Sequence, residues 1–261
     1  MKQTICSNIV GGLMLAFAAV ASMQGDELAY VTTQIGEFGT IDLNTGAYTQ
    51  ISAFGLEGAG LGVAGGRLYT AAYKGSTLYR IDPITGTLTA VGTSAIQYEG
   101  FGSTAKGLYA LDANTNLYSV DPVTAATQLI GPTGIPHGFL SGGIGISTNA
   151  VGLFIAGSDI IYRVETRTGA ARPLSEVPYD FPALLLEGGS LWGITGCGDC
   201  TLQVFTIEPL TGGVTFMANV SGNPAPYVVN GLAPLADGMS VGHASGLPDA
   251  PRPLHMSSSV W

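Results

Sequence analysis

The sequence predicts an all-β fold, a five-bladed β-propeller built from four-stranded antiparallel blades. A phrase of strand, acidic residue, turn and strand recurs five times along the chain. The segments around it alternate apolar and polar residues with period two, and Gly or Pro interrupts them every few residues. The 261 residues include 39 Gly and only 10% charged residues, a composition that suits short strands joined by tight turns.

The repeat is clearest when the five phrases are aligned on their acidic residue. The first reads FGTIDLNTGAYTQIS and the second LYRIDPITGTLTAVG, and three more follow downstream. Successive acidic residues are 40, 39, 44 and 43 positions apart. A repeat of roughly 40 to 45 residues made of short strands is typical of a four-stranded propeller blade. The aligned residues are Asp42, Asp82, Asp121, Glu165 and Glu208.

The second unit shows the expected strand plan of one blade. Strand A is predicted at residues 59–64, strand B at 67–73, strand C at 77–82 and strand D at 87–92. Glycine-containing turns separate these strands, as hairpins require. Alternate side chains of each strand point to opposite faces, so each blade can pack on both of its neighbours.

The turn between strands C and D, Asp-Pro-x-Thr-Gly in this blade, explains why an acidic residue recurs. Pro presets φ at the first turn position, and Gly supplies the positive φ that other residues resist. The acidic side chain can accept hydrogen bonds from the backbone N–H groups of its own turn. Repetition in every blade favours this structural role over five metal sites, so we predict neither a metal site nor a cofactor.

Counting strands predicts how the propeller closes. The mature chain begins with a B strand at residues 27–33 and has no A strand before it. An A-like strand at residues 228–235 is left over after the fifth unit. We therefore expect the C-terminal strand to complete the first blade, which leaves no open sheet edge. The propeller should form one domain over residues 22–237, followed by a flexible tail at 238–261.

The repeated phrase resembles the YVTN-type and related quinoprotein-like β-propeller repeats, and the resemblance extends from Leu28 to about Leu235. It implies the architecture and no particular activity, because such repeats serve surface proteins, lyases, lactonases and binding modules alike. It also implies that ligand sites gather where the D–A and B–C loops meet, near the central channel.

The D–A loops hold acids and aromatic residues that are sparse elsewhere in the chain. Loops carry polar residues because they face solvent, so one hypothesis is that these acids and aromatic residues have a purely structural role. A second is sugar binding, in which rings stack on C–H faces and carboxylates accept hydroxyl hydrogen bonds. A third is a glycosidase- or lyase-like enzyme that uses Glu57, Glu99 or Asp180, because hydrolysis needs two carboxyls about 5–9.5 Å apart. The candidate ligand-binding residues are Glu57, Tyr98, Glu99, His137, Tyr179, Asp180 and Tyr227.

Of these hypotheses we favour a binding or interaction scaffold over an enzyme. The sequence contains no Ser-His-Asp order, nucleophile elbow or P-loop. The expected partner is a small molecule, a glycan or a protein at the D–A and B–C loops. A formal charge of -9 argues against nucleic acid or an anionic membrane, both of which require a basic surface.

The N-terminus predicts export. Lys2 precedes a short apolar run at residues 9–20, and Ala19-Val20-Ala21 offers a small-x-small cleavage pattern. The run is too short for a membrane anchor, which needs about 18 apolar residues. Residues 1–21 are therefore predicted to be a signal peptide, and the mature protein to be secreted or periplasmic.

Two cysteines lie close together in the last blade, at Cys197 and Cys200. A redox C-x-x-C pair needs a helix N-terminus to lower the thiol pKa, whereas this pair falls between predicted strands. Zinc needs four ligands, and no second C-x-x-C or His pair is present. A structural disulfide in an oxidising compartment is the remaining interpretation.

Overall fold

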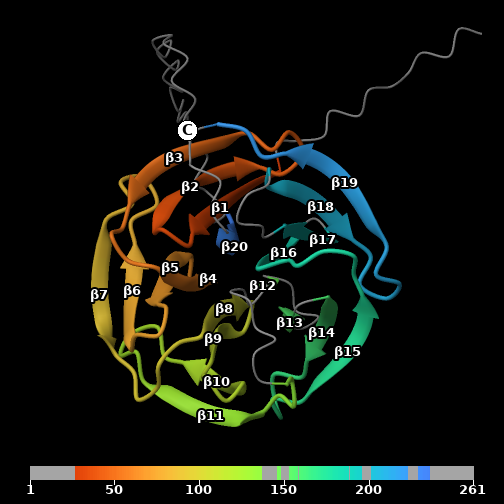
Figure 1. The fold of residues 1–261 in the computed structure, drawn as a ribbon. Helices are drawn as coiled ribbons and strands as arrows, with labels where there is room; N and C mark the ends of the chain where they lie inside the picture. The colour runs from red at the N-terminus through yellow and green to blue at the C-terminus, as the bar shows by residue number, and fades with distance from the viewer. Residues whose placement is uncertain are drawn as a thin grey trace, which may run out of the picture.

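The computed structural model describes residues 27–136, 146–147, 153–157, 159–187, 189–195, 201–222 and 229–235. Over these residues the chain forms strands joined by turns and loops, without a helix. Figure 1 shows the sheets arranged as blades around a central axis, in chain order around the ring. The predicted all-β, five-bladed propeller is confirmed. The predicted signal peptide at 1–21 and tail at 238–261 lie outside the described residues.

Four of the blades have four strands, ordered from the axis outward as A, B, C and D. Blade 1 consists of β20 (Val229–Pro234), β1 (Leu28–Thr33), β2 (Glu37–Asp42) and β3 (Tyr48–Ala53). Blade 2 consists of β4 (Gly58–Ala64), β5 (Arg67–Ala72), β6 (Thr77–Ile81) and β7 (Leu88–Thr93). Blade 3 consists of β8 (Gly100–Thr104), β9 (Gly107–Leu111), β10 (Asn116–Val120) and β11 (Thr127–Pro132). Blade 5 consists of β16 (Ala183–Glu187), β17 (Ser190–Ile194), β18 (Gln203–Ile207) and β19 (Val214–Asn219).

Blade 4 corrects the prediction that every blade has four strands. Among the described residues its sheet contains three, β13 (Leu153–Gly157), β14 (Ile160–Val164) and β15 (Ala171–Glu176). The short strand β12 (Ile146–Ser147) precedes β13 in the chain, but it pairs with β16 of blade 5 and runs parallel to it. The described pairing of β12 therefore extends the sheet of blade 5 at its inner strand and does not complete the sheet of blade 4.

The C-terminal strand closes the ring, as predicted. β20 pairs antiparallel with β1, in a register that places Ala29 opposite Pro234 and Val31 opposite Leu232. Without β20, the inner edge of β1 would be an unpaired row of N–H and C=O groups. The first blade is therefore assembled from the two ends of the described chain.

The core is divided among five hydrophobic clusters, and each cluster lies between two neighbouring blades. Within β6, for example, Leu78 belongs to the cluster between blades 2 and 3, whereas Ile81 belongs to the cluster between blades 1 and 2. Alternation along a strand thus contributes side chains to both interfaces. Each blade is buried on two faces, which explains why apolar residues occupy both alternating positions of the inner strands.

A β-bulge recurs at the same place in the C–D strand pair of all five blades. In blade 2 the register shifts between Leu78 and Tyr79, which leaves Val91 of β7 without an opposite residue. The equivalent shifts in the other blades single out one apolar residue of each D strand. These residues pack against the inter-blade clusters and are Ile51, Val91, Ile130, Leu174 and Met217. A bulge also bends its strand, which suits D strands that run around the circumference (Figure 1).

The small residue after each bulge receives the C–D turn of the next blade. A Cβ added to Gly86, in the turn of blade 2, would overlap the Ser52 side chain in β3 of blade 1. In blade 3 the turn residue is Ala125 instead of glycine, and its Cβ faces Gly92 of β7. At each of these two contacts, one partner is a glycine, either in the C–D turn or in the D strand of the preceding blade. The missing side chain lets the two neighbouring blades approach closely.

We expect Gly86→Ala to destabilise the domain by about 2–4 kcal/mol, because it combines a positive φ of 69° with overlap on Ser52. Adding Ser52→Gly should recover about 1–2 kcal/mol of that loss, since the pair then matches Ala125 and Gly92. Urea unfolding of the two single variants and the double variant measures this coupling. Strictly additive effects would show that the two residues do not contact each other.

Candidate functional site

Two of the predicted carboxylates, Glu57 and Glu99, lie around one lysine. Lys74 is an exposed residue of the B–C turn in blade 2, and its Nζ lies 4.9 Å from the centre of the Tyr73 ring. Tyr73, then Glu99 and, more weakly, Glu57 raise the pKa of Lys74. Burial, followed by the negative charge of Glu99, raises the pKa of Tyr73. The negative charges of two D–A loops, one on either side of blade 2, therefore both act on one ammonium group.

Glu57 is also connected to the C-terminal strand. The buried Asn230 of β20 donates from Nδ2 to Glu57 Oε1 at 3.5 Å and to the Gly58 carbonyl at 3.2 Å. The Glu57 carbonyl accepts a hydrogen bond from the Tyr73 N–H at 2.9 Å. This half-buried residue thus helps to hold blades 1 and 2 together, besides presenting a carboxylate at the D–A loops.

Tyr98, one of the predicted binding residues, has its ring in the core and not at the surface of the D–A loop. Its side chain is completely buried in the cluster between blades 2 and 3, edge-on to Phe101 with ring centres 6.0 Å apart. Its backbone joins the D–A loop to the B–C turn through hydrogen bonds with Gly75 and Lys74, each 2.8 Å. Burial raises the pKa of the Tyr98 hydroxyl. The residue therefore anchors the loop from inside.

A sequence signal for this burial was present but was missed. Leu56, Tyr98 and Phe181 each occupy the position two residues before an A strand begins. Phe181 is completely buried as well, and Leu56 is half-buried. An apolar residue at one fixed place in several D–A loops indicates a core anchor, whereas a ligand-binding residue is expected to differ from blade to blade.

Tyr179 is the predicted aromatic residue that does reach the surface. It lies in the D–A loop between blades 4 and 5 and is 43% exposed. Its ring packs on Phe205 of β18, with ring centres 4.9 Å apart and planes inclined at 32°. Phe205 in turn contacts Phe216 of β19 edge-on at 5.8 Å, and Phe216 is 50% exposed. We call Tyr179, Phe205 and Phe216 the aromatic surface.

Of the remaining predicted residues, one is described by the structure and the others are not. Asp180 is described and half-buried next to Tyr179, in a different loop from Glu57 and Glu99. In the described ranges, no three His, Cys, Asp or Glu side chains are grouped so that they could hold a metal ion. His137, Tyr227 and the two cysteines, Cys197 and Cys200, lie outside the described residues.

The five acidic residues of the repeat accept hydrogen bonds from their own turns. Asp82 Oδ1 accepts the N–H groups of Ile84 at 2.9 Å and Thr85 at 3.0 Å, and Asp42 and Asp121 each accept two N–H groups in the same way. Glu165 and Glu208 accept one each, from the residue two positions later. The Thr85 and Ile84 N–H groups lower the pKa of Asp82, and the corresponding groups lower that of Asp121.

Comparisons with known proteins identify the fold and no family. No family of known sequences matches the chain, and no curated protein does either. Among solved structures, a chain of the nidogen–laminin complex is similar, with a TM-score of 0.52 and 13% identity over 79% of this chain and 80% of that one. A protein of unknown function from Bacteroides thetaiotaomicron has a TM-score of 0.50 and 14% identity, over 74% of this chain and 55% of that one. At such identities the similarity establishes a shared propeller fold. Separately, the described residues contain no helix able to span a membrane.

Proposed function

We propose that the protein is a binding scaffold that holds carbohydrate against the aromatic surface between blades 4 and 5. The observation that carries this proposal is the exposure of two rings, Tyr179 and Phe216, on either side of one buried ring, Phe205. Aromatic faces bind the C–H faces of sugars, and a tyrosine hydroxyl can hydrogen-bond a sugar hydroxyl. Similarity in fold to a chain of the nidogen–laminin complex supports a binding role in general.

The rings are held in place before any ligand arrives. Phe205 is 4% exposed and contacts Phe181, which is completely buried, with ring centres 5.9 Å apart. Tyr179 also lies edge-on to Phe181 at 6.2 Å. Because its neighbours fix its orientation, Tyr179 loses little side-chain freedom when a sugar stacks on it. This preorganisation favours a recognition surface over a random exposed residue.

We expect Tyr179→Ala and Phe216→Ala each to weaken glycan retention at least about fivefold, the loss of roughly 1 kcal/mol that is common for a stacking anchor. A glycan array screened with the mature protein identifies the ligand, and titration of that ligand measures the loss. Leu210→Ala, at a 75% exposed position of the C–D turn in the same blade, is the matched control and should bind normally. Equal affinity of all three variants and the parent would contradict the proposal.

A glycosidase is the second candidate, supported by the negative charges of Glu57 and Glu99, which both raise the pKa of Lys74. An enzyme would release reducing sugar from the retained glycan and would lose that release in Glu99→Gln. A scaffold would return the glycan unchanged. Product analysis of the same array hits separates the two functions.

We also propose export, on the evidence of residues 1–21 alone. Protein recovered from the periplasm or the medium should begin at Ser22, as intact-mass measurement can determine. The same measurement under non-reducing conditions should show Cys197 and Cys200 joined as a disulfide, two mass units below the reduced form. An intact N-terminus would contradict cleavage of a signal peptide. Two free thiols would contradict the disulfide.

A further inference from the structure

The positive charges of the propeller are concentrated at one end of three blades. Of the seven Lys and Arg residues in the described ranges, only Lys74 belongs to a B–C turn. The remaining six lie in A–B loops, in C–D turns or at the adjoining strand ends. They all belong to blades 2, 3 and 4, and are Arg67, Arg80, Lys106, Arg163, Arg167 and Arg172. A protein with a formal charge of -9 thus carries a cationic sector opposite its acidic D–A loops.

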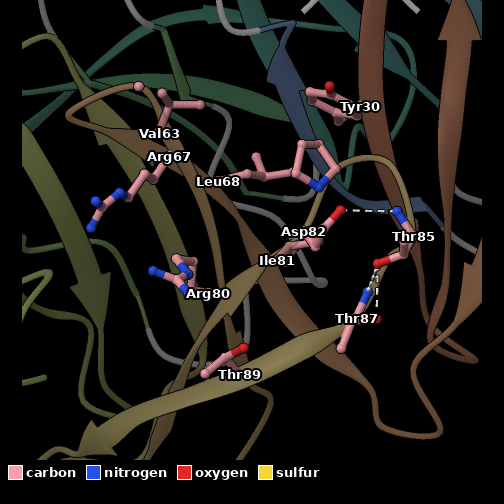
Figure 2. A pocket seen from close by; sticks show the side chains of 12 residues that line it. Tyr30, Val63, Arg67, Leu68, Arg80, Ile81, Asp82, Thr85, Thr87 and Thr89 are labelled. Atoms are coloured by element: carbon pink, nitrogen blue, oxygen red, sulfur yellow. Dashed lines mark hydrogen bonds between the residues drawn. The ribbon is translucent and has the colours of Figure 1, made fainter.

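Two adjoining hollows lie within this sector. The first, of about 370 Å³, is lined by Arg67, Arg80 and the hydroxyls of Thr87 and Thr89. The second, of about 430 Å³, is lined by Lys106 and Ser119 of blade 3. Val63 lines both hollows, so they adjoin, and the first is also lined by Tyr30 of blade 1; we call the two hollows together the cationic groove. Figure 2 shows the Arg67 and Arg80 side chains extending in the same direction, away from Tyr30 and Asp82 in this view.

The polar groups of the cationic groove are available to an anion. Its single acidic residue, Asp82, is occupied by the N–H groups of its own turn, and the charge of Arg80 is the weakest of the influences that lower the pKa of Asp82. Thr85 Oγ1 donates to Thr87 Oγ1 at 2.8 Å, which leaves the Thr87 hydroxyl hydrogen to donate to a ligand. The groove therefore offers guanidinium, ammonium and hydroxyl donors.

The largest apolar residues of the cationic groove are buried, whereas its smaller apolar residues, such as Val63 and Pro83, are half-buried. Tyr30, Leu68 and Ile81 are at most 4% exposed, and in the second hollow Leu108 and Val120 are at most 5% exposed. A ligand that lies along the groove meets guanidinium, ammonium and hydroxyl groups beside these smaller apolar side chains. A polymer whose units carry both hydroxyls and a carboxylate matches this lining, since guanidinium groups bind carboxylates in a bidentate manner.

We propose that the cationic groove binds a carboxylated polysaccharide, with one uronate carboxylate at Arg67 and Arg80 and another near Lys106. This site is separate from the aromatic surface and goes beyond the function proposed above. It also reconciles an acidic protein with an anionic ligand, because the attraction acts locally over about a Debye length, roughly 8–10 Å in physiological salt.

The test uses calorimetric titration of the full mature protein with polygalacturonate. Arg67→Gln combined with Arg80→Gln should weaken binding at least tenfold, as expected for the loss of charge-assisted hydrogen bonds. Lys106→Gln, in an exposed loop, should weaken it by a smaller factor. The matched control is Arg167→Gln combined with Arg172→Gln, which removes the same charge outside the groove and should change affinity less than about threefold. Thermal melting establishes that each variant is folded.

Three results would overturn the proposal. Equal losses in the groove variant and its control would show general attraction between charges. Polyglutamate binding as tightly as polygalacturonate would show that the sugar hydroxyls are not recognised. Absence of measurable binding by the folded parent protein would eliminate the site. The loss of polygalacturonate affinity in Tyr179→Ala is compared with the loss in the groove variant, so failure of the aromatic surface and failure of the cationic groove are distinguishable.

Discussion

Removal of residues 223–261 is expected to abolish cooperative unfolding of the propeller. This truncation deletes β20, whose Val229, Leu232 and Ala233 are at most 4% exposed and belong to the clusters on both sides of blade 1. Fully burying one valine or leucine stabilises a domain by about 1.5–3 kcal/mol, and the strand pairing with β1 is lost as well. Because a domain is stable by only about 5–15 kcal/mol, the loss should leave no native population.

The control for this prediction is a truncation that begins at Gly238, beyond the last described residue, Leu235. Its melting temperature should equal that of the full-length chain, because β20 remains. Near-UV circular dichroism during heating distinguishes the two truncations, since only a packed core gives a cooperative aromatic signal. If the longer truncation melts like the full chain, β20 does not hold the ring closed.

Tyr98→Ala is expected to be the most destabilising side-chain truncation among the predicted site residues. The ring is completely buried between blades 2 and 3 and lies edge-on to Phe101. Truncation of a large buried aromatic side chain typically costs about 3–5 kcal/mol, because the cavity collapses only in part. Denaturant unfolding should show a lower midpoint with an unchanged m-value.

Two variants make this prediction specific. Tyr98→Phe keeps the ring and should cost no more than about 1.5 kcal/mol. Tyr179→Ala truncates a half-exposed ring of the same type and should cost far less than Tyr98→Ala. Similar midpoints for Tyr98→Ala and Tyr179→Ala would mean that Tyr98 does not belong to the core.

Much of the fold follows from local chemistry that the sequence displays directly. The spacing of the acidic residues from Asp42 to Glu208 predicts five units, and the turn residues predict where each C strand ends. The predicted strands of blade 2 agree with β4 to β7 to within one residue at each end. Closure by residues 228–235 was predictable because the first unit lacks an A strand and one A-like strand is left over after the fifth unit.

The sequence alone determined the number of blades, the turns and the closure, because each depends on neighbours in the chain or on counting. The tertiary structure decided which loop residues face solvent: Tyr98 and Tyr179 both occupy D–A loops, yet one is buried and the other is 43% exposed. It also placed the bulges, the pairing of β12 with β16, and the cationic groove. The pairing of β12 and the groove depend on contacts between blades about 40 residues apart, where the fit of a side chain against a distant strand outweighs its local preference.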